Sequence, residues 1–170
     1  MVNFHKVDLV AAAAALVMVS AAADARPTRG KVVGQNGSIS GVSGANGGTI
    51  RGRGTVQNAD GSVTTKSGRA AQTVNGGKGF RRSTTTVNPD GSANRQSAAA
   101  ANGPRGSAAT SSNVTRNADG SYSGGSTSTA TNNATGNTYN GSTQIDPSTG
   151  KPVRAATCTD ASGAVIACPR

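Results

Sequence analysis

The sequence predicts an all-β protein, built as a repetitive antiparallel meander or as stacked hairpins. Three observations support this fold class. One turn sequence occurs three times, the segments between turns are rich in β-branched and small residues, and large apolar side chains are scarce. Thr and Val favour the half-exposed surface of a sheet, whereas a compact globule must bury enough apolar surface to offset the entropy of ordering the chain. The sequence therefore favours order that comes from backbone pairing and repetition.

The repeated turn has the pattern Asn-x-Asp-Gly-Ser and begins at residues 58, 88 and 117. We expect the Asn side chain to fold onto its own backbone, and the Gly to supply the positive φ that a hairpin turn requires. With weaker turns between and after these, a turn occurs about every 14 residues, which leaves room for strands of about 8–10 residues. The predicted turn residues are Asn58, Asp60, Gly61, Asn88, Asp90, Gly91, Asn117, Asp119 and Gly120.

Residues 1–25 have the features of an export signal. A short polar, basic start precedes an apolar run from Leu9 to Ala23, and Ala23-Asp24-Ala25 fits the small-x-small cleavage rule. The run is shorter than the roughly 18 to 20 residues that span a bilayer, although a retained membrane anchor is the alternative. The sequence favours export to the periplasm, the cell surface or the extracellular space, with no membrane span after cleavage.

Residues 26–54 form a Gly-rich basic segment that ends in Arg51-Gly52-Arg53-Gly54. No apolar periodicity supports a helix, and interior glycines weaken strands. We therefore expect a flexible or loosely extended arm. A β-repeat region follows over residues 55–150, and its four consecutive alanines, Ala98–Ala101, are assigned to the sheet because so short a segment cannot nucleate a stable helix.

Substantial disorder is the alternative to the β-repeat, because hydrophobicity is low and net charge is high. Beyond residue 25 the chain holds 16 Lys and Arg against 5 Asp, a net charge of +11, and it contains no Leu, Met, His, Trp or Glu. The regular turn spacing argues for the β-repeat. Pairing with a partner could also supply order that the isolated monomer lacks.

Cys158 and Cys168 flank the last predicted turn, inside a C-terminal hairpin over residues 151–170. In an exported protein this arrangement predicts a disulfide that closes the hairpin. The rival interpretations are a metal site or a reactive cysteine, but the exported part holds no His or Glu to complete a zinc site or to act as a base. General acid–base chemistry lacks its usual residues for the same reason. We expect no enzyme, no catalytic, cofactor or metal site, and no small-molecule substrate.

The basic character is the remaining functional signal. Thirteen cations fall between Arg26 and Arg116, and none lies between residues 117 and 150. Arg-rich extended chains bind anionic polymers with little sequence reading, and an Arg pair beside an aromatic residue occurs in single-strand binders. Alternatively, the charge only keeps an edge-rich β chain soluble. The predicted partners are extracellular DNA, lipopolysaccharide or acidic polysaccharide, and the predicted polyanion-binding residues are Arg51, Arg53, Arg69, Arg81 and Arg82.

The Asn-x-Asp-Gly-Ser turns and the Ser/Thr/Ala strands over residues 55–150 resemble small secreted Gly/Ser/Thr/Asn-rich repeat proteins of Gram-negative bacteria. These proteins include curli-like matrix subunits and repetitive adhesins. The resemblance implies a structural or adhesive component of the bacterial cell surface or extracellular matrix, with self-association. The alternative function is a soluble basic envelope protein that binds anionic polymers.

Overall fold

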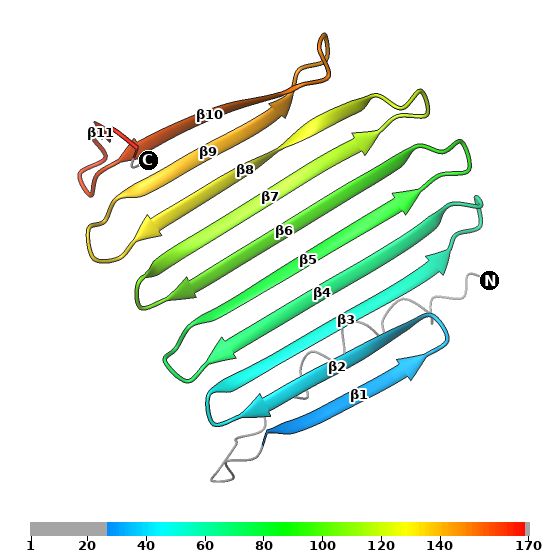
Figure 1. The fold of residues 1–170 in the computed structure, drawn as a ribbon, viewed down its shortest axis with the longest axis horizontal. Coiled ribbons are helices and arrows are strands. Elements are labelled where there is room, and N and C mark those ends of the chain that lie inside the picture. Colours follow the sequence, from blue (N-terminus) through cyan, green and yellow to red (C-terminus); the bar gives the residue numbers. More distant parts are fainter. Residues whose placement is uncertain (1–26, 169–170) are drawn as a thin grey trace, which may run out of the picture.

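The computed structural model describes residues 27–168, which form eleven strands in one antiparallel sheet without a helix in this range. The strands pair in chain order from the first to the last, so the all-β meander that the sequence predicts is confirmed (Figure 1). The predicted export signal over residues 1–25, together with Arg26, lies outside the described residues. The strands are β1 (Thr28–Gly34), β2 (Gly37–Gly44), β3 (Gly47–Gln57), β4 (Val63–Thr73), β5 (Lys78–Val87), β6 (Ala93–Gly103), β7 (Gly106–Arg116), β8 (Tyr122–Asn132), β9 (Thr138–Ile145), β10 (Pro152–Thr159) and β11 (Val165–Ile166).

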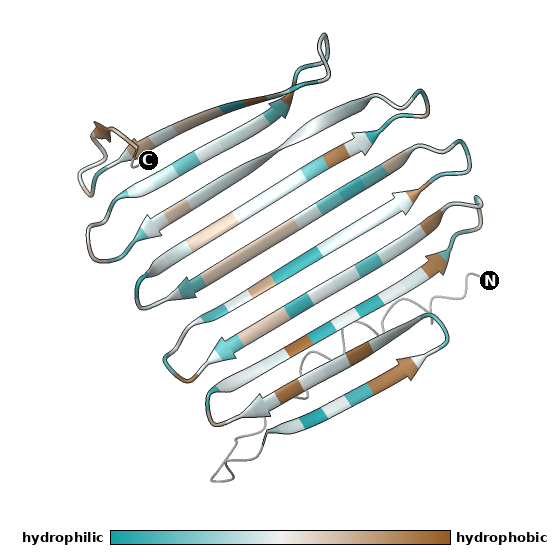
Figure 2. Ribbon diagram, in the orientation of Figure 1, coloured by the Kyte–Doolittle hydropathy of each residue, from teal (hydrophilic) through white to brown (hydrophobic). Residues whose placement is uncertain are grey.

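The sheet is a single layer, and both of its faces are open in the described part of the chain (Figure 1). Among these residues only Cys158 and Ser62 are buried, at 4% and 2% exposure. Figure 2 shows hydrophobic and hydrophilic residues mixed along the strands instead of gathered into a core. Backbone pairing, and not apolar burial, therefore holds most of the fold together.

Hydroxyl pairs across neighbouring strands support the backbone ladder. Ser67 Oγ lies 3.1 Å from Ser83 Oγ, and Ser97 Oγ lies 2.8 Å from Ser112 Oγ. The strand register places Ser67 opposite Ser83, Ser83 opposite Ser97 and Ser97 opposite Ser112. The four serines therefore form one row across β4, β5, β6 and β7. Directly opposed Ser and Thr pairs stabilise a sheet by about 0.2–1 kcal/mol each. The row therefore favours this register over a slipped one.

The Gly-rich segment over residues 26–54 is not the flexible arm that we expected, because residues 28–57 contain β1, β2 and β3. Glycine here serves the close approach of backbones. A Cβ at Gly37 would overlap the carbonyl oxygen of Arg53 and lie 2.8 Å from Gly54 Cα. Interior glycines weaken an isolated strand, but pairing of β3 with β4 over its whole length supplies the order that the segment lacks by itself.

The three Asn-x-Asp-Gly-Ser turns join β3 to β4, β5 to β6 and β7 to β8, and all three lie at the same end of the strands (Figure 1). Their glycines have the predicted positive φ, at 82°, 82° and 86°. The predicted role of Asn was wrong. Asn58 Nδ2 donates to Ser62 Oγ at 2.8 Å, while Asp60 Oδ1 accepts from the backbone N–H of Ser62 at 2.9 Å. Because the Ser62 N–H lies two residues after Asp60, the carboxylate forms the local turn in place of Asn. The turns at 88 and 117 repeat both bonds.

The turn carboxylates are expected to make stability fall at acid pH. The hydroxyl and then the backbone N–H of Ser62 lower the pKa of Asp60 below its ordinary value. A carboxyl whose pKa is lower in the folded chain stabilises the fold above the unfolded pKa of about 3.9, and this contribution is lost as the pH falls through the folded pKa. Serine hydroxyls lower the pKa in the same way at Asp90, Asp119, Asp146 and Asp160.

Urea denaturation followed by circular dichroism tests this expectation. The midpoint should hold from neutral pH to about pH 5 and decline below about pH 4. Replacing Ser62, Ser92 and Ser121 with alanine should raise the pKa of the three facing carboxyls in an NMR titration. Ser83→Ala, far from any of these turns, serves as the control. A midpoint that stays constant through the acid range would contradict the expectation.

The predicted disulfide between Cys158 and Cys168 is confirmed. The pairs Cys158↔Ile166 and Thr159↔Val165 join β10 to β11, so the bond closes the predicted C-terminal hairpin. Across residues 27–168 there is no helix that could serve as a membrane span. The disulfide is compatible with an exported protein.

Candidate functional site: the basic face of the sheet

The strand register divides the cationic side chains unequally between the two faces of the sheet. Successive residues of a strand point to opposite faces, and directly paired residues share a face. The face that carries Arg51 is here called the basic face, and the other is called the second face. The second face holds three strand cations, Lys66, Lys78 and Arg82. The basic face holds nine, all of them exposed: Arg29, Lys31, Arg51, Arg53, Arg69, Arg81, Arg95, Arg116 and Arg154.

Three arginines lie directly opposite one another on the basic face and form the arginine row. Arg51 pairs with Arg69 across β3 and β4, and Arg69 pairs with Arg81 across β4 and β5. Lys31 of β1 continues the row through Ser40, whose Oγ accepts a hydrogen bond from Arg51 Nε at 3.0 Å. Neighbouring strands are about 4.8 Å apart, and like charges directly opposite each other destabilise a sheet. An anion bound across the row would relieve this repulsion.

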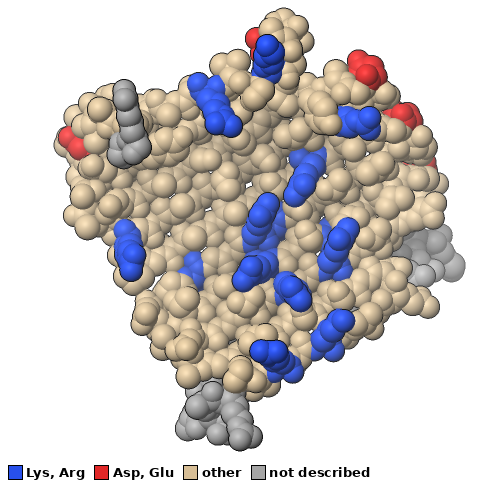
Figure 3. Space-filling model, viewed as in Figure 1, with Lys and Arg blue, Asp and Glu red and all other residues tan. Residues whose placement is uncertain are grey.

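Negative charge is kept away from both faces. Every Asp in the described residues lies in a turn, where its carboxylate accepts hydrogen bonds from a nearby serine. Figure 3 shows Lys and Arg side chains spread over one face and densest over its middle and lower part, with the visible acidic side chains at the perimeter. The basic face therefore presents positive charge without acidic partners among the strand residues of 27–168.

The structure brings four of the five predicted polyanion-binding residues together. Arg51, Arg53, Arg69 and Arg81 share the basic face, but Arg82 projects from the second face. The reason is the alternation along a strand, which must separate Arg81 from Arg82. Sequence reasoning also missed five cations of this face. Counting whether each one lies an odd or an even number of residues from the neighbouring turn could have assigned it to this face. The five cations are Arg29, Lys31, Arg95, Arg116 and Arg154.

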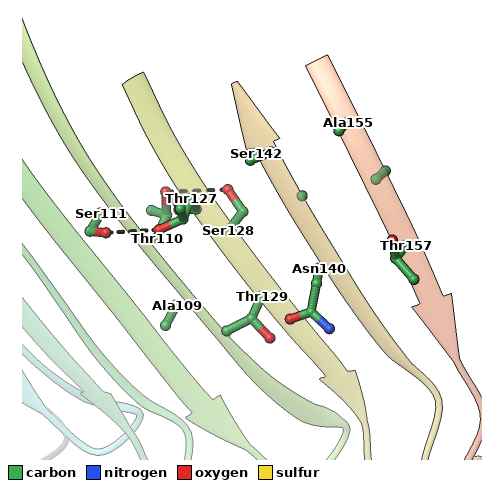
Figure 4. Close-up of a pocket in the computed structure, with 12 residues that line it drawn as sticks. Ala109, Thr110, Ser111, Thr127, Ser128, Thr129, Asn140, Ser142, Ala155 and Thr157 are labelled. Carbon is green, nitrogen blue, oxygen red and sulfur yellow. Dashed lines mark hydrogen bonds between the residues drawn. The ribbon is translucent and has the colours of Figure 1, made fainter. Parts of the chain in front are cut away.

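The second face differs from the basic face over β6 to β10, where short neutral side chains predominate. Two shallow hollows, of 580 and 600 Å³, are lined mainly by second-face residues of β5 to β10. Figure 4 shows the first of them, with hydroxyl, amide and methyl groups from β7, β8, β9 and β10. Ser111 Oγ and Thr127 Oγ1 lie 3.0 Å apart in it. These hydroxyls hydrogen-bond to each other and carry no charge, so the surface that they line is nearly neutral.

Comparison of the chain with known protein families, curated proteins and solved structures finds no match. Within residues 27–168, no group of three or more His, Cys, Asp or Glu side chains is placed to hold a metal ion.

Proposed function

We propose that the protein binds anionic polymers outside the cytoplasm through its basic face. The observation that carries the proposal is the distribution of strand cations, nine on one face against three on the other. A polymer that contacts several of these cations at once releases several counterions, and this release drives binding without a shaped pocket. A small anion would contact few of these cations and would therefore gain little binding free energy from counterion release.

Tyr122, directly opposite Arg116, lies on the basic face, but the arginine row itself has no aromatic side chain beside it and is suited to recognition through charge. Phe80 pairs with Ala70 and Ala100 on the second face, so its ring projects away from the arginine row. Base stacking on an aromatic side chain, which many single-strand binders use, is therefore not available beside Arg81. Phosphate, sulfate or carboxylate groups along a flexible chain would satisfy the row equally well. Extracellular DNA, lipopolysaccharide and acidic polysaccharide all carry such groups.

Binding to single-stranded DNA over a series of salt concentrations tests the proposal. If only four cations contact phosphates, as in the arginine row together with Lys31, log K should fall with log salt with a slope of about −3. If all nine contact phosphates, the slope should be about −6. Heparin should show a similarly steep fall, and the uncharged polymer dextran should not bind. Binding that is unchanged between low and moderate salt would contradict the proposal.

A structural or adhesive role in the surface layer or matrix is a second candidate, which the open edges of the sheet favour. In the described residues β1 pairs only with β2, and β11 covers only Cys158 and Thr159 of β10. Such edges can pair with further strands, although Arg29, Lys31 and Arg154 near them oppose close association. Fractionation of the native host separates the two candidates. An insoluble, cell-associated chain favours the structural role, and a soluble chain in the periplasm or medium favours the binding role.

A further inference from the structure

The two faces of the sheet differ in whether they can be covered by another protein layer. A protein domain normally buries each sheet face against a second layer, but both faces are open in this single layer of strands. Covering the basic face with a second copy would bring eighteen cations together without an acidic partner from the strands. Uncompensated buried charge is strongly destabilising, so this face is suited to remain in contact with solvent or a polyanion.

The second face carries no charged residue over β6 to β10 within the described chain. Its side chains there are short, and they are Ala, Ser, Thr, Asn, Gln, Gly and Val only. Short neutral side chains allow two sheets to approach to about 10 Å, the spacing of stacked sheets. Ala98, Ala109, Ser111, Thr127, Thr129 and Ser142 occupy the middle of this surface.

The area of this surface matches what a stable dimer needs. On one face each residue covers about 32 Å², because strands are ~4.8 Å apart and same-face residues ~6.7 Å apart. Five strands with four or five second-face residues each therefore cover roughly 700 Å². A standard protein interface buries about 800 Å² on each partner. The second hollow, which Gln96 and Gln144 help to line, leaves room on this face for side chains of an opposing copy.

We propose that two copies of this chain associate back to back through the second face over β6 to β10, with both basic faces outward. A second copy fits this surface because both partners are neutral there. An acidic or basic partner would find no countercharge, and the described part of the surface has no aromatic ring for a sugar to stack on. The resulting dimer presents nine strand cations on each of two opposite sides. It would therefore link two anionic polymers, which a single-sided monomer cannot do. The dimer itself does not depend on polymer binding.

Sedimentation velocity of the purified chain over a series of concentrations, with matched charge insertions, tests the dimer. Ser111 and Thr127 are directly opposite on the second face, and Thr110 and Ser128 are directly opposite on the basic face of the same two strands. Ser111→Lys with Thr127→Lys should raise the dissociation constant at least about a hundred-fold, because each dimer would bury four unpaired charges. Thr110→Lys with Ser128→Lys adds the same charge and should leave the dimer intact.

Circular dichroism and the intact disulfide check that both double variants fold, and the milder single variants Ser111→Lys and Ser128→Lys repeat the comparison. The inference is overturned if the unmodified chain is monomeric at every concentration. It is also overturned if both lysine pairs weaken association equally. Growth into larger species that persists in both pairs would place association at the strand edges, and this too would overturn it.

Discussion

Replacing Arg51, Arg69 and Arg81 with alanine is expected to weaken binding to single-stranded DNA about 50-fold at about 0.15 M salt. Each lost phosphate contact lowers the magnitude of the salt slope by about 0.7, so the slope should become shallower by about 2. The three side chains are exposed and directly opposed. Their removal relieves like-charge repulsion, and the variant is therefore expected to fold. Fluorescence anisotropy at several salt concentrations measures both quantities.

The chain provides a matched control for this variant. Lys66→Ala, Lys78→Ala and Arg82→Ala remove the same net charge from β4 and β5, but from the second face. If binding depends on the basic face, this control should retain most of the affinity and most of the salt slope. Equal losses in the two variants would mean that net charge alone governs binding, and the assignment to one face would fail.

Gly124→Ala is expected to lower the stability of the sheet by at least about 2 kcal/mol, equivalent to a fall in Tm of roughly 5 °C. Gly124 lies inside β8 with a φ of 108°, a conformation that residues with a Cβ rarely adopt. A Cβ there would also overlap the carbonyl oxygen of Asn113 and lie 3.0 Å from its carbonyl carbon. Either the β7–β8 pairing or the backbone of β8 must shift to admit it.

Gly68→Ala in β4 is the matched control for Gly124→Ala. Its added methyl would meet its nearest neighbour, the carbonyl oxygen of Arg81, at 3.8 Å, which is ordinary contact. Its effect should be near neutral or slightly stabilising, because alanine also reduces the entropy of the unfolded chain. Thermal melts of both variants with the disulfide intact decide the matter. Equal destabilisation would show that position 124 has no special backbone requirement.

The strands and turns from residue 55 onward could be predicted because their signals are local. Asp60 and Gly61 sit in a pattern that forms a turn from its own hydrogen bonds, and the Ser and Thr segments favour a sheet. The segment over β1 to β3 could not be predicted in this way. Its glycines are compatible with a strand only when a partner strand lies against them, and no local pattern records that partner.

The residues that make up the basic face could be predicted only in part from the sequence, for a different reason. Proximity in sequence grouped Arg81 with Arg82, whereas the pleat of a strand places neighbours on opposite faces. Which arginines of different strands meet depends on the register, and the register follows from the length of every turn between them. Arg51 and Arg69 are 18 residues apart in the chain, yet they are direct partners in the sheet.

The strictly sequential pairing of β1 to β11 also bears on how the chain folds and how its length can change. Each interior strand pairs only with the strands before and after it along the chain, so stability is close to a sum of neighbouring hairpin contributions, as in repeat proteins. Such a chain can begin to fold at any hairpin and lose strands from its ends inward, since within residues 27–168 the first and last strands do not pair with each other. Adding or deleting a whole hairpin between equivalent turns would leave the flanking pairs unchanged. The reach of the sheet across a polymer is thus set by how many hairpins the chain contains.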